Sequence, residues 1–396
     1  MKPRIYLDYA ATTPVDPEVL QAMMPFFTDR GFNPSSLHSE GRSAHAALDS
    51  ARDSVARSIG AERKEVTFTG SGSEADTHAI LGAARAYAKR GRHVVASAVE
   101  HHAVLHALDA LRDDGFEISL VPVDDRGIVE PALFAAALRH DTILASVAYA
   151  NNEIGTIAPI AELAAIAHRA GVLFHTDAVQ APEWLPIDVT ALGVDMLTLS
   201  AHKFYGPKGV GALYVREGLS LAPLIHGGGQ EFGRRAGTEN VAGIVGFAAA
   251  LERAVAGRAE RFVRIAALRD RLENGICRRV DGIRINGAGA ARLPNNCNVS
   301  FEGVDSETLL ARLDLDGVAV SAGSACTSGA TEPSHVIAAL GIDPRWHSGA
   351  IRFSLGTSSR ESEIDDVLSL LVRVVAELRG NKISARTARL REGVGF

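Results

Sequence analysis

The sequence predicts an α/β protein, with a large domain built on a mainly parallel seven-stranded sheet and a smaller α+β domain. Three observations indicate this class. The chain has 396 residues, which is too long for one simple core, so two domains that share an interface are expected. From about residue 65 to 215, short β-branched runs alternate with Ala-rich helical stretches, as in right-handed βαβ units. After about residue 255 the chain changes to a charged helix, turn-rich segments and a second alternation.

The strands expected in the large sheet are short apolar or β-branched runs, at residues 66–69, 93–97, 117–121, 142–149, 173–176, 196–199 and 211–215. Helices are expected over 73–89 and 103–113, between the first three of these strands. The run at 211–215 follows its predecessor with no helix between them, which allows it to be an antiparallel member of the sheet.

The change of pattern along the chain gives the expected domain boundaries. Residues 15–255 form the large domain, and residues 1–14 and 256–378 form the small domain, which begins with a helix over about 257–280. The segment 379–396 carries five arginines or lysines and little apolar periodicity, so we expect a loosely held tail.

The composition is that of an ordinary globular protein, with 46% hydrophobic and 22% charged residues. The formal net charge of −6 gives no overall field that would recruit nucleic acid or an acidic membrane. The first eight residues hold no apolar run of signal-peptide length, and no stretch reaches the roughly 18 uncharged apolar residues of a membrane helix. We therefore expect a cytoplasmic protein without nucleic-acid or membrane partners.

The chain has three cysteines, and an odd number at long spacings argues against a disulfide framework or a Cys-x-x-Cys metal site. Cys277 lies in a helical pattern and Cys297 borders a predicted strand, so both are expected to be small buried residues. Cys326 differs, because glycine, serine and alanine surround it.

A Gly-rich turn at residues 69–76, Thr-Gly-Ser-Gly-Ser-Glu-Ala-Asp, is the first candidate binding motif. Glycines let a ligand approach the backbone, and the helix start that follows offers unpaired N–H groups. An ordinary tight turn, capped by Ser71 or Ser73, is the alternative. A dinucleotide fingerprint is disfavoured because no acid occurs from residue 77 to 99, and a Walker A loop because no Lys-Ser/Thr follows. A single phosphate suits the segment best.

Lys203 lies in a polar cluster directly after an apolar strand, and the chain then turns through Gly-Pro and Lys-Gly. A lysine at the carboxyl end of a central strand is costly unless it is paired or covalently modified, and ligands bind at this edge of open α/β sheets. An imine between Lys203 and an aldehyde cofactor satisfies both conditions, with Ser200 and His202 as donors to its phosphate. A surface lysine paired with a carboxylate is the alternative.

Asp177 ends another apolar strand. A pyridinium cofactor needs a carboxylate against its ring nitrogen, which keeps that nitrogen protonated and the ring an electron sink. Asp177 suits this role, and Gln180 could reach the ring oxygen. A helix N-cap is the ordinary role of a strand-end aspartate, but the cluster around Lys203 favours the cofactor role.

Eight motifs resemble those of cysteine desulfurases of the NifS/IscS type, in the family's order from about residue 5 to 370. They are Asp-Tyr-Ala-Ala-Thr-Thr-Pro at 8–14, Asn-Pro-Ser-Ser-Leu-His at 33–38, Asn-Asn-Glu-Ile-Gly at 151–155, Ser-Ala-His-Lys-Phe-Tyr-Gly-Pro-Lys-Gly at 200–209, His-Gly-Gly-Gly-Gln-Glu at 226–231, Arg-Ala-Gly-Thr-Glu-Asn at 235–240, Ser-Ala-Cys-Thr-Ser at 324–328 and Ile-Arg-Phe-Ser-Leu-Gly at 351–356. The resemblance implies fold type I of the pyridoxal-phosphate-dependent transferases, pyridoxal 5'-phosphate as cofactor, L-cysteine as substrate and a homodimer.

The resemblance also implies a role for each matching position. Lys203 would bear the cofactor and later move protons, and His101 would stack on the cofactor ring and act in proton transfer. Arg352 would clamp the substrate carboxylate, for which its planar fork is suited, with Asn152 nearby. The remaining cofactor contacts would be Gly72, Ser73, Ser200 and His202 at the phosphate, Asp177 and Gln180 at the ring nitrogen and ring oxygen, Asn152 beside the ring, and Thr238 from a second subunit.

Two features depart from the common family pattern. Asp76 and Thr77 replace a frequent Asn-Asn pair, which adds a negative charge near the phosphate loop. The acidic-aromatic C-terminal motif that grips scaffold proteins is absent, so the sulfur acceptor is open between an iron–sulfur scaffold, a tRNA-thiolation factor or another protein. His101, His102 and His106 could suggest a metal cluster, but no His-Glu-x-x-His pattern occurs, and we expect no metal.

Cys326 is the cysteine expected to accept sulfur. Residues 321–330 are nearly all small and should be mobile, which suits a thiolate that attacks sulfur at the cofactor and delivers a persulfide elsewhere. The expected reaction converts L-cysteine to L-alanine and leaves a persulfide on Cys326. A structural cysteine in a small-residue turn is the alternative for this segment.

Three other functions compete with this one. Selenocysteine lyase of the same fold is the nearest alternative. Transamination is disfavoured because it leaves the Cys326 segment without a role, and a cofactor-free carrier protein would need an idle Lys203.

Overall fold

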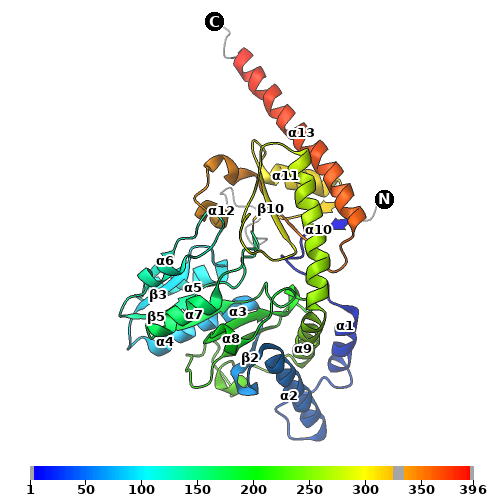
Figure 1. Ribbon diagram of the computed structural model, residues 1–396. Coiled ribbons are helices and arrows are strands. Elements are labelled where there is room, and N and C mark those ends of the chain that lie inside the picture. Colours follow the sequence, from blue (N-terminus) through cyan, green and yellow to red (C-terminus); the bar gives the residue numbers. More distant parts are fainter. Residues whose placement is uncertain (1–3, 324–333, 393–396) are drawn as a thin grey trace.

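The computed structural model describes the backbone of residues 4–323 and 334–392, and the side chains of residues 4–323 and 334–380. A large sheet with helices around it forms one part of the molecule, and a smaller sheet packs beside the long helices α10 (Arg258–Arg279) and α13 (Glu361–Glu392) (Figure 1). Cys326 lies outside the described residues.

The large sheet has seven strands in the order β2-β8-β7-β6-β5-β3-β4. Their bounds are β2 Val66–Thr69, β3 His93–Ser97, β4 Glu117–Val121, β5 Thr142–Ser146, β6 Leu173–Asp177, β7 Met196–Ser200 and β8 Gly211–Val215. The ladders from β7 to β4 are parallel, whereas β8 pairs antiparallel with both β2 and β7. The prediction of a mainly parallel α/β sheet with an antiparallel member at 211–215 is confirmed.

Both faces of this sheet are buried, as the uninterrupted apolar strands indicate. Val94 packs in a core cluster with α5, whereas the next residue, Val95, packs in a separate cluster with α7. Neighbouring residues of a strand point to opposite faces, so each cluster covers one face. The helices of this part of the chain are α1 Pro17–Met23, α2 Ser39–Ile59, α3 Gly72–Thr77, α4 Ala83–Tyr87, α5 His102–Asp113, α6 Pro131–Ala137, α7 Ile160–Arg169, α8 Val189–Leu192 and α9 Val241–Ala256.

The helix predicted over 73–89 forms with an interruption, because a π-helical turn at His78–Gly82 separates α3 from α4. The carbonyl of Gly82 accepts a 3.0 Å hydrogen bond from the N–H of Ala222. A β-carbon at Gly82 would lie only 2.9 Å from Ala222 O, so the glycine permits this close crossing.

The smaller sheet is antiparallel, with the order β12-β10-β9. Its strands are β9 Ile283–Ile285, β10 Asn296–Phe301 and β12 Ala350–Ser354, and its helices besides α10 and α13 are α11 Ser306–Leu315 and α12 His335–Ala339. A separate parallel pair joins β1 (Ile5–Tyr6) to β11 (Val318–Ala319). The chain start therefore pairs with residues more than 300 positions away.

The two described cysteines differ in burial. Cys297 in β10 is fully buried, as predicted. Cys277 is exposed, so the prediction that it is buried is wrong. Ile265, Leu268, Leu272 and Ile276 form the buried face of α10, and Cys277 lies one position beyond this stripe, about 100° further around the helix.

Residues 8–13 lie between the smaller sheet and the large one. Asp8 forms a parallel bridge with Ser354 of β12, and Thr13 N donates to the carbonyl of His202 at 2.9 Å. At the other end of the chain, α13 continues into the segment 379–396 as far as Glu392. Within the described residues, none of the helices is long and apolar enough to cross a membrane.

Candidate functional site

A single cavity lies at the carboxyl ends of β6 and β7, the edge of the sheet where ligands bind in open α/β folds. It is lined by polar side chains from both sheets, and by Ala10 and Ala11 of the chain start. The predicted site residues that line it are Gly72, Ser73, His101, Asn152, Asp177, Gln180, Ser200, His202, Lys203 and Arg352.

Asp177 is the last residue of β6 and is 9% exposed. Its Oδ1 accepts a 2.8 Å hydrogen bond from the N–H of Val179, which fixes the carboxyl group at the start of the following loop. Burial raises the pKa of Asp177 to about 6, and the Val179 N–H and the charge of Lys203 oppose this rise. A cation at the carboxylate, such as a protonated ring nitrogen, would stabilise its charged form.

Lys203 closes the short 3₁₀ turn Ala201–Lys203 that follows β7. Its Nζ donates to the carbonyls of Ala10 and Ala11, at 2.7 and 2.8 Å. Gln180 Nε2 donates to the same Ala10 carbonyl at 3.0 Å. The amine is therefore held beside Asp177 and Gln180 by backbone carbonyls of the chain start.

The start of α3 is crowded and rich in donors. Ser71 caps the helix by accepting the N–H of Glu74 at 3.0 Å, whereas the Glu74 carboxylate turns back to the N–H of Gly70 at 2.8 Å. A β-carbon at Gly72 would lie 3.0 Å from Ser200 Cβ and 3.1 Å from Val179 Cγ2, so only glycine fits there without displacement. The side chains and N–H groups here suit a phosphate group.

His202 also lines the cavity. Its Nδ1 lies 3.1 Å from the Thr12 hydroxyl, and burial, with the charges of Lys203 and Lys208, lowers its pKa to about 4. The imidazole is therefore neutral and can donate from one nitrogen. The donor set, the tight glycine and the Asp177–Lys203 pair fit a phosphorylated pyridoxal.

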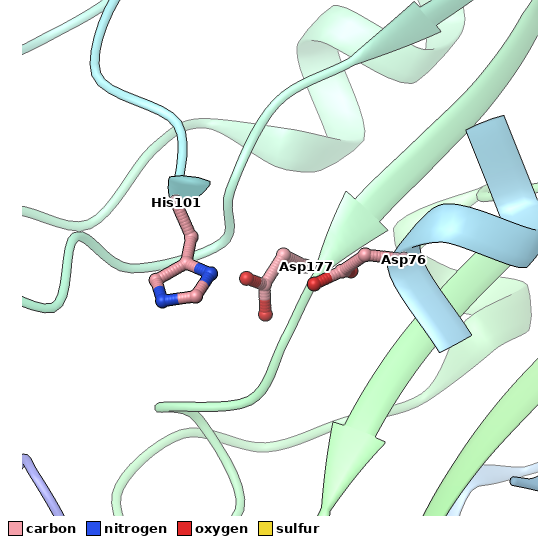
Figure 2. A group of neighbouring side chains, drawn as sticks. All are labelled: Asp76, His101 and Asp177. Carbon is pink, nitrogen blue, oxygen red and sulfur yellow. The ribbon is translucent and has the colours of Figure 1, made fainter. Parts of the chain in front are cut away.

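His101 is the N-cap of α5, and its Nδ1 accepts the N–H of Ala103 at 3.1 Å. Burial lowers its pKa to about 4, and the charge of Lys203 adds to that effect, so the ring is neutral. Figure 2 shows the imidazole on one side of Asp177 and the carboxyl group of Asp76 on the other. A neutral, half-buried ring at this place can stack on an aromatic ligand and exchange a proton.

Arg352 lies in β12 of the smaller sheet, is buried with an exposed fraction of 1%, and also lines the cavity. Its Nη2 donates to Asp8 Oδ1 at 2.8 Å, and its Nη1 donates to the carbonyl of Asn152 at 2.9 Å. Its Nε has no hydrogen-bond partner among the described residues. The guanidinium has five N–H donors, so the two bonds that fix it leave others for a small carboxylate.

Thr238 and Cys326 complete the predicted set. Thr238 is exposed in the loop before α9 and does not line the cavity of its own chain. Cys326 lies outside the described residues, between Gly323 and Ser334. Ser334, the first described residue after this gap, donates from Oγ to Glu153 Oε2 at 2.5 Å, and Glu153 directly follows the cavity residue Asn152.

Several residues of the site were not assigned a role from the sequence. Asp8, Ala10 and Ala11 belong to a quoted motif, but only the fold shows that they hold Arg352 and Lys203. Glu100 is fully buried, directly precedes His101, and accepts a 2.8 Å hydrogen bond from the N–H of Ala148. The signal that could have pointed to Glu100 is a lone acid after the apolar strand β3.

Comparison with known proteins shows the family to which this chain belongs. The model of the family described as aminotransferase class-V matches residues 5–367. The chain is 48% identical, over 379 residues and 96% of each chain, to a protein of Dictyoglomus turgidum named cysteine desulfurase IscS.

Solved structures show the same similarity. A structure titled "NIFS-like protein" superposes with a TM-score of 0.89 at 38% identity, and covers 94% of this chain and 99% of its own. One titled "SspA in complex with cysteine" gives a TM-score of 0.80 at 36% identity, and covers 89% of this chain and 98% of its own. The likeness of fold therefore extends over nearly the whole of this chain.

Proposed function

Because this chain belongs to the class-V aminotransferase family and is a pyridoxal-phosphate-dependent cysteine desulfurase, we propose that it uses Lys203 to bind the cofactor and Cys326 to accept sulfur from L-cysteine. The observation that carries this assignment is the position of Lys203 Nζ, held on two carbonyls in the cavity that Asp177 and Arg352 also line. The name of the relatives favours cysteine over selenocysteine as substrate.

The residues that line the cavity could make the cofactor contacts. Gly72, Ser73, Ser200 and His202 would hold the phosphate, Asp177 would face the ring nitrogen, and Gln180 would face the ring oxygen. When bound, pyridoxal phosphate supplies an electron sink for the negative charge that forms at the substrate Cα.

The proposed substrate contacts are Arg352 and Asn152, which line the same cavity. Arg352 binds the carboxylate of cysteine with its guanidinium, and Asp8 and the carbonyl of Asn152 keep that guanidinium in place. The side chain of Asn152 would lie beside the ring oxygen and this carboxylate. Lys203 would remove the proton from the substrate Cα at its Nζ, and His101 would exchange a proton with the substrate from its neutral imidazole.

The sulfur is transferred to Cys326. Its thiolate attacks the substrate sulfur, so that an S–S bond forms at Cys326 while the Cβ–S bond breaks, and the carbon atoms leave as alanine. The segment 321–330 that carries Cys326 begins at Ser321, which bridges to Arg352. Cys326 is therefore five positions along the chain from a residue that pairs with the proposed substrate clamp, Arg352.

Two variants test these roles. Lys203→Ala should abolish the absorbance of the bound cofactor, and Cys326→Ala should retain that absorbance but produce no alanine or sulfide from cysteine. Release of sulfide by Cys326→Ala at the wild-type rate would contradict the assignment of Cys326 as the sulfur acceptor. Wild-type protein that carries cofactor but turns over selenocysteine and not cysteine would favour the lyase.

A homodimer would complete the site with Thr238. The loop that carries Thr238 is anchored to its own chain, because Glu231 forms a buried ion pair with Arg52 at 2.6 Å and Arg235 pairs with Glu74 at 2.9 Å. Thr238 itself is exposed, so we propose that it contacts the phosphate bound by a neighbouring chain. Sedimentation of a fully loaded, active monomer would refute this proposal.

The remaining proposals concern the cell and the domains. We propose residues 15–255 as the large domain and residues 1–14 with 256–378 as the small one, a cytoplasmic location, and a protein that accepts the persulfide for iron–sulfur cluster or thio-cofactor assembly. Proteins recovered in disulfide-sensitive complexes with the Cys326 persulfide, compared with the Cys326→Ala variant, would identify the acceptor.

A further inference from the structure

Two carboxyl groups meet in the floor of the cavity (Figure 2). Asp76 lies in α3, and Asp177 lies at the end of β6. One carboxyl oxygen of each and one ring nitrogen of His101 all lie within 4.8 Å of one another. Asp76 is 1% exposed and Asp177 is 9% exposed. Two ionised carboxylates at this separation repel each other strongly in a buried site.

Little positive charge lies near Asp76. Its side chain has a hydrogen bond with Thr198, and His175 Nε2 lies 3.7 Å from Asp76 Oδ1, beyond hydrogen-bonding distance. The two ring nitrogens of His175 are engaged by the hydroxyls of Ser146 at 2.9 Å and Thr198 at 3.1 Å. Burial lowers the pKa of His175 to about 3, so its ring is neutral.

The other titratable groups around Asp76 do not change this balance. Glu100 is a further buried acid, and His101 is neutral for the reason given above. The charge of Lys203 acts on Asp177, where it opposes the rise in pKa.

Oδ1 of Asp76 has no hydrogen-bond partner among the described residues. A charged oxygen buried without a donor pays the full cost of desolvation, whereas a protonated carboxyl group avoids most of that cost.

We propose that Asp76 holds a proton at neutral pH, so that the Asp76–Asp177 pair presents one negative charge, not two, to the ring nitrogen of the cofactor. This inference rests on the proposed position of the ring nitrogen at Asp177. Burial and the neighbouring Asp177, in that order of importance, raise the pKa of Asp76 well above its ordinary value. Asp76 acts through Asp177 and is therefore a positioning residue.

A single charge matches the chemistry of the site. One carboxylate balances one protonated ring nitrogen, whereas a second carboxylate would repel the anionic carboxylate and thiolate that enter during the reaction. The affinity for an anionic substrate should therefore fall at the pH where Asp76 loses its proton.

Infrared difference spectra of the holoenzyme, wild type against Asp76→Asn, test the proton directly. We expect the carbonyl stretch of a protonated carboxyl group in the wild type, a weaker band as the pH rises, and no such band from this position in Asp76→Asn. Glu100→Gln is the matched control, because it removes another buried acid and should leave the Asp76 band in place. A neutral-pH spectrum without the Asp76 band would overturn the proposal.

Thermal unfolding against pH gives a second measurement. The folded state holds the Asp76 proton more tightly than the unfolded state, so the stability of the wild type falls as the pH rises above the ordinary range of aspartate. The Asp76→Asn variant lacks this loss, and its Tm relative to the wild type should rise by about 2 °C between acidic and alkaline pH. A difference that stays constant with pH would show that Asp76 is only a packing residue.

The two outcomes separate this inference from the proposed function. Neither the infrared band nor the Tm depends on turnover. A protein with the Asp76 proton but no bound cofactor would contradict the proposed function alone, whereas a loaded, active enzyme without that proton would contradict this inference alone.

Discussion

Asp8 and Arg352, 344 positions apart in the sequence, form a 2.8 Å hydrogen-bonded ion pair at the wall of the cavity. The arginine is almost fully buried and the aspartate side chain is 17% exposed, so water screens the pair only weakly. The pair fixes the guanidinium that we propose to bind the substrate carboxylate.

Replacing the aspartate of this pair should weaken substrate binding. In Asp8→Asn the guanidinium loses its ionic partner, and we expect KM for cysteine to rise about tenfold, equivalent to ~1.4 kcal/mol, with little change in kcat. Steady-state kinetics checks this, and Asp314→Asn, which removes the exposed partner of Arg4, is the control. An unchanged KM would show that Asp8 does not position Arg352.

The buried Arg52–Glu231 pair should contribute strongly to stability. Arg52 donates to both carboxylate oxygens, at 2.6 and 2.7 Å, and both side chains are almost fully buried. Arg52→Ala leaves Glu231 charged and unpaired, which should cost about 3–5 kcal/mol of unfolding free energy. Arg63→Ala breaks exposed pairs and should cost less than about 1 kcal/mol in the same urea titration. Equal losses for the two variants would contradict this.

Glu100 should make stability depend on pH. Burial raises its pKa to about 8, although Ser97, Ala148 and Ser146 donate hydrogen bonds that oppose the rise. The folded state therefore binds a proton that the unfolded state releases near the ordinary pKa of glutamate, so stability falls as the pH rises from about 4.5 to about 8. Glu100→Gln should flatten this fall in urea titrations across the range. If the stability of the variant fell equally steeply with pH, a group other than Glu100 would be responsible for the fall.

The tight glycine at the start of α3 should be essential for cofactor affinity. In Gly72→Ala the new methyl group meets Ser200 and Val179, which must move away from the proposed phosphate position. We expect about tenfold weaker binding in a titration of apoenzyme with pyridoxal phosphate, ~1.4 kcal/mol. Gly380→Ala, where a β-carbon meets nothing within 4 Å, is the control and should bind normally.

The two described cysteines should differ in reactivity. Cys277 is exposed and Cys297 is fully buried. A thiol reagent should modify Cys277 in the folded protein and reach Cys297 only after unfolding, as mass spectrometry of protease digests can measure. Cys277→Ser should retain full desulfurase activity, and a loss of activity in this variant would question the assignment of sulfur transfer to Cys326.

The sequence allowed the large sheet to be predicted well, because each strand is a short apolar run and Gly211–Val215 follows β7 without a helix. The boundaries were less accurate where tertiary contacts intervene. The run predicted at 142–149 ends as a strand at Ser146, and Tyr149 N then donates to the Asp177 carbonyl outside the ladder. The π turn at His78–Gly82 also has a long-range contact, since the Gly82 carbonyl accepts a hydrogen bond from Ala222, 140 positions away.

The site was predictable to the extent that each residue carries its own chemistry. Asp177 ends β6, and Lys203 lies three residues beyond the end of the neighbouring parallel strand β7, so parallel topology brings both to one edge of the sheet. The contacts of Ala10 and Ala11 with Lys203 were not predictable, because carbonyl oxygens leave no trace in the residue type. The pairing of Asp76 with Asp177 was missed for a similar reason, since it depends on how α3 packs on β7.

Because β1 pairs with β11, the first residues of the chain can complete their contacts only late in synthesis. When residue 300 leaves the ribosome, Lys203 and Asp177 have long been available, but β1 still has no partner strand and Asp8 has no Arg352. These contacts of the first residues of the nascent chain can form only after β11 and β12 have been synthesised. A chain that stops before β12 can fold its large sheet, yet it cannot close the substrate wall of the cavity. Premature termination should therefore yield proteins that lack this wall, and translation must be nearly complete before the enzyme can bind its substrate.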